Sequence, residues 1–190
     1  MLTEALKNDT KLAHAELEGR MIPAIKAIDS EAGYYRLLEM MYGFYAPLEE
    51  SIDAYVNEEK MPGYGQRRKA SLLIQDMTVL NQQQVQAPQQ LCTDLPVIEN
   101  YAQAIGAMYV LEGSTLGGKI IAGMIQKRVA AVDKALHFFN GYGEKAMNMW
   151  NAFKEQVNTG IQNDKKVEVI QSANDTFTAF KRWIALYEQQ

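Results

Sequence analysis

A histidine near the start of the chain, His14, is the first residue whose type and surroundings point to chemistry. It lies in a stretch with helical periodicity, where Leu6, Thr10 and Leu17 share its face. A neutral imidazole on an apolar face can bind iron through one ring nitrogen while an acceptor holds the other nitrogen. Glu18 follows four residues later, within helical reach to be that acceptor. The alternative is a hydrogen-bonded core histidine, which is the commoner role of a histidine that stands alone.

A run of glycines between residues 106 and 118 is the second such feature. The segment is hydrophobic and has helical periodicity, yet four glycines interrupt it. Each glycine inside a helix costs about 1 kcal/mol relative to alanine, so the run needs a compensating gain. Gly106, Gly113 and Gly117 are spaced by seven and four residues, which puts them on one helix face. A flat ligand can lie against such a bare face, but close packing against another helix explains the same spacing.

Other metal or thiol chemistry has little support in the sequence. Cys92 is the sole cysteine, and His137 is the only histidine besides the one already described. A zinc site needs several such ligands at close spacing, so we expect none. We expect Cys92 to be an inert thiol in a loop and His137, which precedes two phenylalanines and a turn, to have a structural role.

Composition restricts the class of protein. The 190 residues are 47% hydrophobic and 22% charged, which is typical of a globular protein with a large core. The net charge of -4 argues against nucleic acid as the main partner. No segment has the roughly 20 uninterrupted apolar residues of a membrane span, and no signal peptide is recognisable at the N-terminus. We therefore expect no membrane association and a cytoplasmic location.

The elements that must position these residues are helices, because apolar residues recur at helical spacing and alternating strand patterns are sparse. The expected fold is all-α: a single-domain bundle of six to eight helices over residues 1–190. The first expected helix begins after Thr3 and runs towards Gly19, and the second runs from Ser30 past Tyr55 with a bend at Pro47. The remaining expected helices cover Gln66–Leu80, Val97–Val129, the stretch from the Asn140–Gly143 turn to Asn158, and Lys165–Tyr187.

Signals at the ends of these helices are also visible. Thr3 is a good N-cap for the first helix, and Pro96 suits the first turn of the long helix that carries the glycines. The glutamine-rich residues 81–95 are expected to form a loop, which is long for a compact domain.

Two of these segments together resemble the heme oxygenase family. The first is Leu2–Lys7 followed by Thr10, Lys11 and His14; the second is residues 109–118, which is similar to the distal helix of bacterial heme oxygenases, including those associated with bacteriophytochromes. Supporting segments at 34–49, 68–76 and 138–153 follow in the family's order. The resemblance covers most of the chain and implies the heme oxygenase-like helical fold.

The resemblance implies a role for each matching position. His14 would be the proximal iron ligand, and Gly113 and Gly117 would let the distal helix backbone approach the heme and flex. Lys7 and Lys154 sit where the family places basic residues that meet the heme propionates.

One position departs from the mammalian pattern. Ser114 stands where mammalian members have an aspartate that organises distal water, although similar bacterial members lack that aspartate too. Candidates for ordering the proton-delivering waters are then Tyr109, Glu112 and the Ser114 hydroxyl.

The implied reaction makes heme both cofactor and substrate, with dioxygen as co-substrate and biliverdin, carbon monoxide and ferrous iron as products. Electrons must come from outside, because the chain has no Rossmann fingerprint, flavin motif or iron–sulfur cysteines. We expect a ferredoxin or a flavoprotein reductase as the donor. Lys119, Lys127 and Arg128 are candidates for docking it, and an ordinary solvated face is the alternative.

Three other functions remain open at this stage. A heme carrier or sensor of the same fold would keep His14 but lack turnover. An enzyme of the related thiaminase-like fold would bind a small organic ligand without heme, and Cys92 fits its chemistry poorly. A helical interaction protein would use the glycines for backbone contact alone. Fold by itself does not decide among them.

Overall fold

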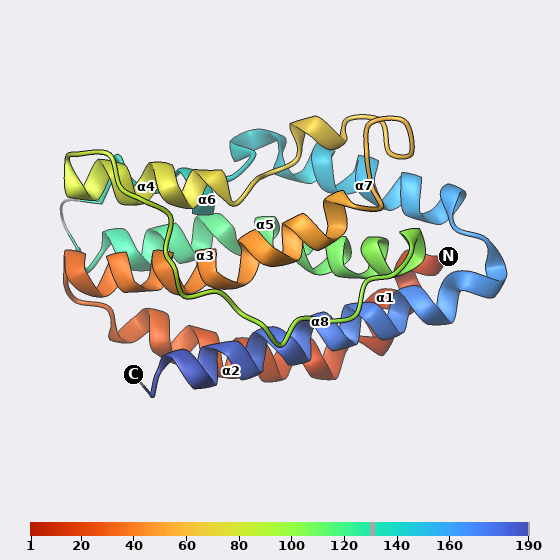
Figure 1. The fold of residues 1–190 in the computed structure, drawn as a ribbon, viewed down its shortest axis with the longest axis horizontal. Coiled ribbons are helices and arrows are strands. Elements are labelled where there is room, and N and C mark those ends of the chain that lie inside the picture. Colours follow the sequence, from red (N-terminus) through yellow and green to blue (C-terminus); the bar gives the residue numbers. More distant parts are fainter. Residues whose placement is uncertain (130–131, 190) are drawn as a thin grey trace.

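The structure, a computed structural model, describes residues 1–129 and 132–189, and every regular element in these ranges is helical (Figure 1). The α-helices are α1 (Leu2–Asp9), α2 (Lys11–Ala27), α3 (Glu31–Asp53), α4 (Ser71–Asn81), α5 (Tyr101–Gln126), α6 (His137–Asn140), α7 (Ala146–Gly160) and α8 (Lys166–Tyr187). Short 3-10 turns lie at Tyr64–Gln66, Gly143–Lys145 and Asn163–Lys165. The expectation of an all-α bundle is confirmed.

Helix α5 is the centre of the bundle. It contacts α2, α3, α6, α7 and α8, and its longest contact is with α8 (Figure 1). Most of its first half is buried, including Ile105, Ala107 and Met108. Because α5 carries the glycine run, the packing around it decides which glycines lie against protein and which remain open.

Two of the glycines serve packing. A Cβ atom added at Gly106 would overlap the carbonyl oxygen of Val169 and lie 2.7 Å from the Cβ atom of Ser172, both on α8. A Cβ atom at Gly118 would overlap the carbonyl oxygen of Phe139 on α6. The spacing left open whether the face of Gly106, Gly113 and Gly117 meets a ligand or another helix, and at Gly106 it is helix packing, because α8 covers it.

The chain start forms two helices where the sequence predicted one. The break falls at Thr10, which has φ -101° and ψ -1° and whose Oγ1 donates a hydrogen bond of 2.7 Å to the Leu6 carbonyl. Thr3 lies inside α1, and Met1 is the N-cap. The predicted cap at Thr3 is wrong because its amide and hydroxyl groups both bond to Asn158 on α7, at 3.0 and 3.2 Å.

Several other helix ends differ from the expected positions. Helix α3 begins next to Ser30 as predicted, and Ser30 caps it, since its Oγ accepts from the Gly33 amide at 3.2 Å, but the helix ends before Tyr55. Helix α4 starts at Ser71, five residues later than expected. Helix α5 starts at Tyr101, where the Asn100 side chain caps it, so that Pro96 lies in the preceding loop. The predicted loop therefore extends to residue 100.

This loop lies across the bundle as an extended strap, drawn in yellow-green in Figure 1. The Cys92 amide donates to the Gly43 carbonyl of α3 at 2.7 Å. Gly43 allows this approach, since a Cβ atom there would lie 2.6 Å from the Gln90 carbonyl oxygen and from the Trp183 ring. Cys92 is part of this strap and is buried, and burial raises the pKa of its thiol, which disfavours the reactive thiolate.

No helix of the described residues has both the length and the apolar character that a membrane crossing requires.

The division of the α5 glycines predicts opposite effects of alanine at two of them. Gly118→Ala should lower the free energy of unfolding by about 1–3 kcal/mol, because the added methyl group must displace the α6 backbone. Gly123→Ala is the matched control on the same helix: nothing lies within 4 Å of its Cβ position, so alanine should stabilise the protein by up to about 1 kcal/mol. Chemical denaturation measures both, and equal stability of the two variants would contradict this packing.

Candidate functional site

His14 projects from α2 with its imidazole half exposed, the side chain being 52% accessible. The ring packs edge-on against Phe177 of α8, with centroids 5.4 Å apart and planes at 67°. Its Nε2 lies 3.6 Å from Glu18 Oε1, and neither ring nitrogen donates or accepts a hydrogen bond within the described residues. Leu6, Thr10 and Leu17 are buried as predicted, whereas His14 lies at the edge of that buried face. The imidazole is thus held by packing, with its nitrogens available to a ligand.

Gly113 and Gly117 leave the α5 backbone open. A Cβ atom at Gly113 would meet only the Trp150 ring, at 3.8 Å, and one at Gly117 would meet nothing within 4 Å. Leu116 and Ile120 on the neighbouring turns are exposed apolar side chains. Packing within the protein therefore does not explain these two glycines, and their bare backbone fits a flat apolar ligand.

A contact between Thr10 and Tyr109 sets α2 and α5 side by side. The Tyr109 side chain lies close to Thr10, and burial raises the pKa of the Tyr109 hydroxyl. Both helices run from right to left in Figure 1. His14 and Gly113 each lie one helical turn beyond this contact, at four residues. The topology thus brings the imidazole and the bare backbone to the same level of the bundle.

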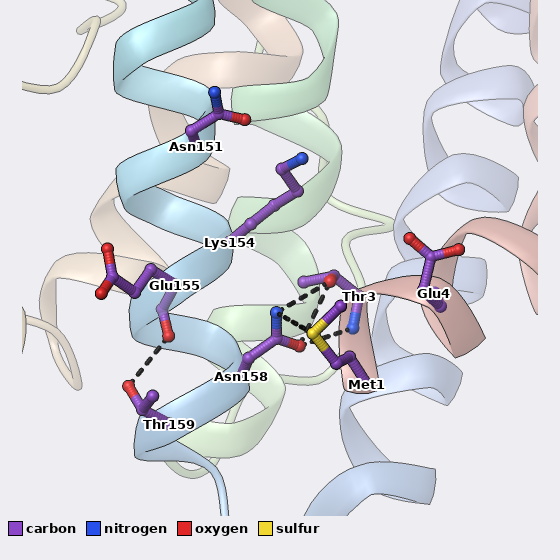
Figure 2. A pocket seen from close by; sticks show the side chains of 8 residues that line it. All are labelled: Met1, Thr3, Glu4, Asn151, Lys154, Glu155, Asn158 and Thr159. Atoms are coloured by element: carbon purple, nitrogen blue, oxygen red, sulfur yellow. Dashed lines mark hydrogen bonds between the residues drawn. The ribbon is translucent and has the colours of Figure 1, made fainter.

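Helix α7 supplies the aromatic and basic groups beside these residues. Trp150 lies 5.4 Å from the Tyr109 ring, centroid to centroid, and the Lys154 amine lies 5.9 Å from the Trp150 centroid. Lys154 lines a pocket of about 360 Å³ between α7 and the start of α1, and Figure 2 shows it on α7 between Asn151 and Asn158, across from Thr3 and Glu4.

Lys7 is exposed on α1, the helix that packs against α7. In the described part of the chain, neither Lys7 nor Lys154 forms an ion pair. Two adjacent helices therefore each present a free cation near the Thr10–Tyr109 contact.

The Ser114 hydroxyl has no hydrogen-bonding capacity to spare. Its Oγ accepts from the Tyr45 hydroxyl at 3.1 Å and from Arg68 Nη2 at 2.6 Å, and it donates to the Leu111 carbonyl at 2.7 Å. A serine hydroxyl offers one donor and two acceptor positions, and all three are used. Sequence reasoning missed Arg68 and Tyr45 as site residues, because only the tertiary fold brings them to α5.

Glu112 points into a buried polar cluster. Its carboxylate accepts from Arg67 Nη1 at 2.9 Å and from the Tyr142 hydroxyl at 2.9 Å, and both members of the ion pair are about 95% buried. Burial and the Glu112 charge raise the pKa of Tyr142. These contacts give Glu112 a structural role, whereas the sequence predicted it only as a candidate for ordering water.

His137 has the structural role that the sequence predicted. The buried Asp76 carboxylate accepts from the His137 amide at 2.8 Å and the Phe138 amide at 2.9 Å, and it lies 2.7 Å from His137 Nδ1. The contact fixes α6, whose backbone packs on Gly118. Within the described residues, histidine, cysteine and carboxylate side chains form no cluster of three or more that suits a metal ion.

Comparisons with known proteins agree with this geometry. The family model described as heme oxygenase matches residues 1–185. A relative named heme oxygenase from Xanthomonas campestris pv. campestris (strain 8004) is 28% identical over 159 residues, which is 83% of this chain and 92% of the relative. The NO- and CO-bound heme oxygenase from Neisseria meningitidis has a similar fold, with a TM-score of 0.77 and 20% identity, covering 98% of this chain and 92% of the other.

The buried ion pair gives a stability prediction. Glu112→Gln leaves the Arg67 charge buried without a partner, which should cost about 3 kcal/mol or more. For a chain of this length that corresponds to a fall of roughly 6–12 °C in Tm, measured by circular dichroism. The matched control is Arg182→Gln, which removes an exposed ion pair with Asp94 and should change stability by less than about 1 kcal/mol. Equal shifts in the two variants would show that Glu112 carries no buried pair.

Proposed function

The chain belongs to the heme oxygenase family and is an enzyme of that activity, which cleaves heme oxidatively, and on this premise we propose that His14 binds the heme iron while the α5 backbone at Gly113 and Gly117 covers the opposite face of the ring. The main support for this proposal is the position of the bare α5 backbone at Gly113. It lies one helical turn beyond the Thr10–Tyr109 contact, at the same level of the bundle as the half-exposed His14 imidazole. Packing within the protein does not explain the bare backbone, and the packing of His14 on Phe177 leaves both imidazole nitrogens without a hydrogen bond to a described residue. Together these features suit a flat apolar ring with a metal at its centre.

The donor set fits heme. A neutral imidazole is the common proximal ligand of heme iron, and Phe177 restrains the ring edge-on so that its orientation is fixed before binding. Glu18 is close enough to orient the second nitrogen after a small side-chain movement, since the gap is 3.6 Å.

The cations suit the propionates. Lys7 and Lys154 come from adjacent helices, carry no carboxylate partner within the described residues, and lie near Tyr109 at one end of the site. Each amine would meet one propionate at the solvent edge, where the ring's charged groups remain hydrated. Tyr109 and Trp150 then supply apolar contact beside the ring.

When bound, heme supplies both the iron that activates dioxygen and the ring carbon that is oxidised. The residues of this chain hold and shield it. His14 would hold the iron from one side. Because Gly113 and Gly117 lack side chains, the α5 backbone would lie directly against the ring with no large side chain between them. These residues would thus bind and orient the heme, whose own chemistry supplies the oxidation.

Dioxygen as co-substrate and an external electron donor complete the proposal. The donor would be a ferredoxin or a flavoprotein reductase. Lys119, Lys127 and Arg128 lie exposed at the C-terminal half of α5 and just after it, and none pairs with a carboxylate within the described residues. An acidic redox protein is the complementary partner for these cations.

The other functions fit less well. Cys92 is a buried residue of the strap with a raised thiol pKa, which argues against the thiaminase-like chemistry. The family match favours the enzyme over a helical interaction protein. A carrier or sensor shares the heme site, and the family match favours the enzyme over it. We propose that residues 1–190 act as one domain, since α1 packs directly on α7 and α8.

Hemin titration tests the iron ligand. The protein should show a saturable Soret band and, with ascorbate or a ferredoxin system in air, a biliverdin absorbance. His14→Ala should lose the saturable band, because the iron loses its protein ligand. His137→Ala is the control and should keep it, since that ring bonds to Asp76. A stable band without turnover would indicate a carrier, and no saturable binding would remove the heme site altogether.

A side chain at Gly117 separates ligand fit from folding. Gly117→Leu should leave Tm unchanged or raise it slightly, because nothing occupies that space in the protein. It should weaken hemin binding by at least about tenfold, or 1.4 kcal/mol, because the leucine occupies the ring's position. Gly123→Leu lies on the same helix in equally open space and should bind hemin normally. If both variants bind alike, the bare face at Gly117 is not the heme face.

A further inference from the structure

Two consecutive arginines, Arg67 and Arg68, reach the turn of α5 that contains Gly113. Both come from the extended segment between the 3-10 turn at Tyr64–Gln66 and α4. Arg67 Nη1 donates to the Glu112 carboxylate at 2.9 Å and to the Met149 carbonyl at 3.0 Å, so it ties α5 to α7. Its guanidinium also lies over the Phe153 ring, 5.6 Å from the centroid.

Arg68 binds the same turn at other atoms. Its Nη2 donates to the Leu111 carbonyl at 3.0 Å and to Ser114 Oγ at 2.6 Å. The guanidinium stacks over Phe138 at 4.1 Å and Tyr45 at 5.4 Å, distances measured to the ring centroids. Its Nε and Nη1 groups make no hydrogen bond to a described residue. Arg68 is therefore anchored at one end of its planar fork and has donors to spare at the other.

Tyr142 joins the two arginines into one network. Its hydroxyl donates to Glu112 at 2.9 Å and accepts from the Arg68 backbone amide at 2.7 Å. We call Arg67, Arg68, Glu112, Ser114 and Tyr142 the arginine clamp. The clamp includes hydrogen bonds to residues 111, 112 and 114, which lie on both sides of Gly113 in the sequence.

The arginine clamp can fix a turn of α5 that has no side chain at Gly113. Gly113 has no side chain through which the protein could fix this part of α5, and glycine makes a helix easier to deform. The polar contacts fix the turn through its neighbours instead. Among the described residues, the cations bonded to residues 111–114 are Arg67 and Arg68. Glu112 pairs with Arg67, whereas the half-buried Arg68 has no carboxylate partner in this part of the chain.

We propose that the arginine clamp is the positioning device that fixes the 111–114 turn against the heme, and that Arg68, acting through Ser114 and its spare donors, sets the hydrogen-bonding environment on the open face of the iron. This proposal rests on the heme site proposed above. It assigns to Arg68 the ordering of water that the saturated Ser114 hydroxyl and the ion-paired Glu112 cannot provide.

The sign of the effect follows from charge. A cation near the iron favours the deprotonated form of a water molecule bound there, so it lowers the pH at which the ferric complex changes from its acid to its alkaline spectrum. Removing the charge should raise that midpoint. Replacing arginine by lysine keeps the charge but loses the planar guanidinium, which stacks on Phe138 and Tyr45 and so aims its Nη2 at Leu111 and Ser114.

The test uses the full chain loaded with hemin. Arg68→Gln should raise the pH midpoint of the acid–alkaline spectral change by about one unit and lower kcat by about tenfold, with KM changed by less than about threefold. Arg68→Lys should keep the midpoint and still lower kcat, because the turn is held less firmly. Arg182→Gln, which removes an exposed arginine from a surface ion pair, is the control and should change none of these values.

The Tm of each apo variant shows whether the variants remain folded. If Arg68→Gln leaves midpoint and kcat unchanged, or changes kcat only in proportion to the folded fraction, the positioning role is refuted while the heme site stands. If Arg68→Gln does not fold, an unchanged kcat in folded Arg68→Lys overturns the proposal. Failure of the unmodified chain to bind hemin overturns the proposed function itself and this proposal with it.

Discussion

The structure depends on how closely other groups can approach the backbone of α5. At Gly106 and Gly118 the backbones of α8 and α6, respectively, pack so closely against α5 that no Cβ atom fits. Between them, Gly113 and Gly117 carry the same absence of a side chain but face open space. One helix thus uses the same residue type both to pack the bundle and to leave a surface free for a flat ligand.

The glycines lower the helix stability of α5 at the turn where the proposed heme site requires a fixed backbone. Glycines lower helix stability and make bending easy, and the bare face has no side chains to anchor it. Arg67 and Arg68 compensate by bonding Glu112, Leu111 and Ser114. A buried ion pair is rarely the most stabilising choice, because desolvation offsets much of its attraction. Its value here lies in fixed geometry, which a network of directional bonds supplies better than apolar contact.

The proximal side is organised more simply. The break at Thr10 separates α1 from α2, and the Thr10–Tyr109 contact sets the level of His14 relative to Gly113. Phe177 then restrains the imidazole from α8. The basic residues come from two further helices, so the site draws on α1, α2, α5, α7 and α8. Helix α5 contacts α2, α7 and α8, and α1 packs on α2, α7 and α8.

The sequence by itself determined the helical class, the approximate helices, His14 as the iron-ligand candidate and the bare character of Gly113 and Gly117. These follow from residue type and local periodicity, which are properties of neighbouring residues, and from the resemblance. Tertiary structure alone decided that Gly106 packs on α8, that Thr3 bonds to Asn158 instead of capping a helix, and that Glu112 is tied to Arg67. It also brought Arg68 to Ser114, 46 residues apart. Such pairings depend on which helix faces which, and no local pattern in the chain records that choice.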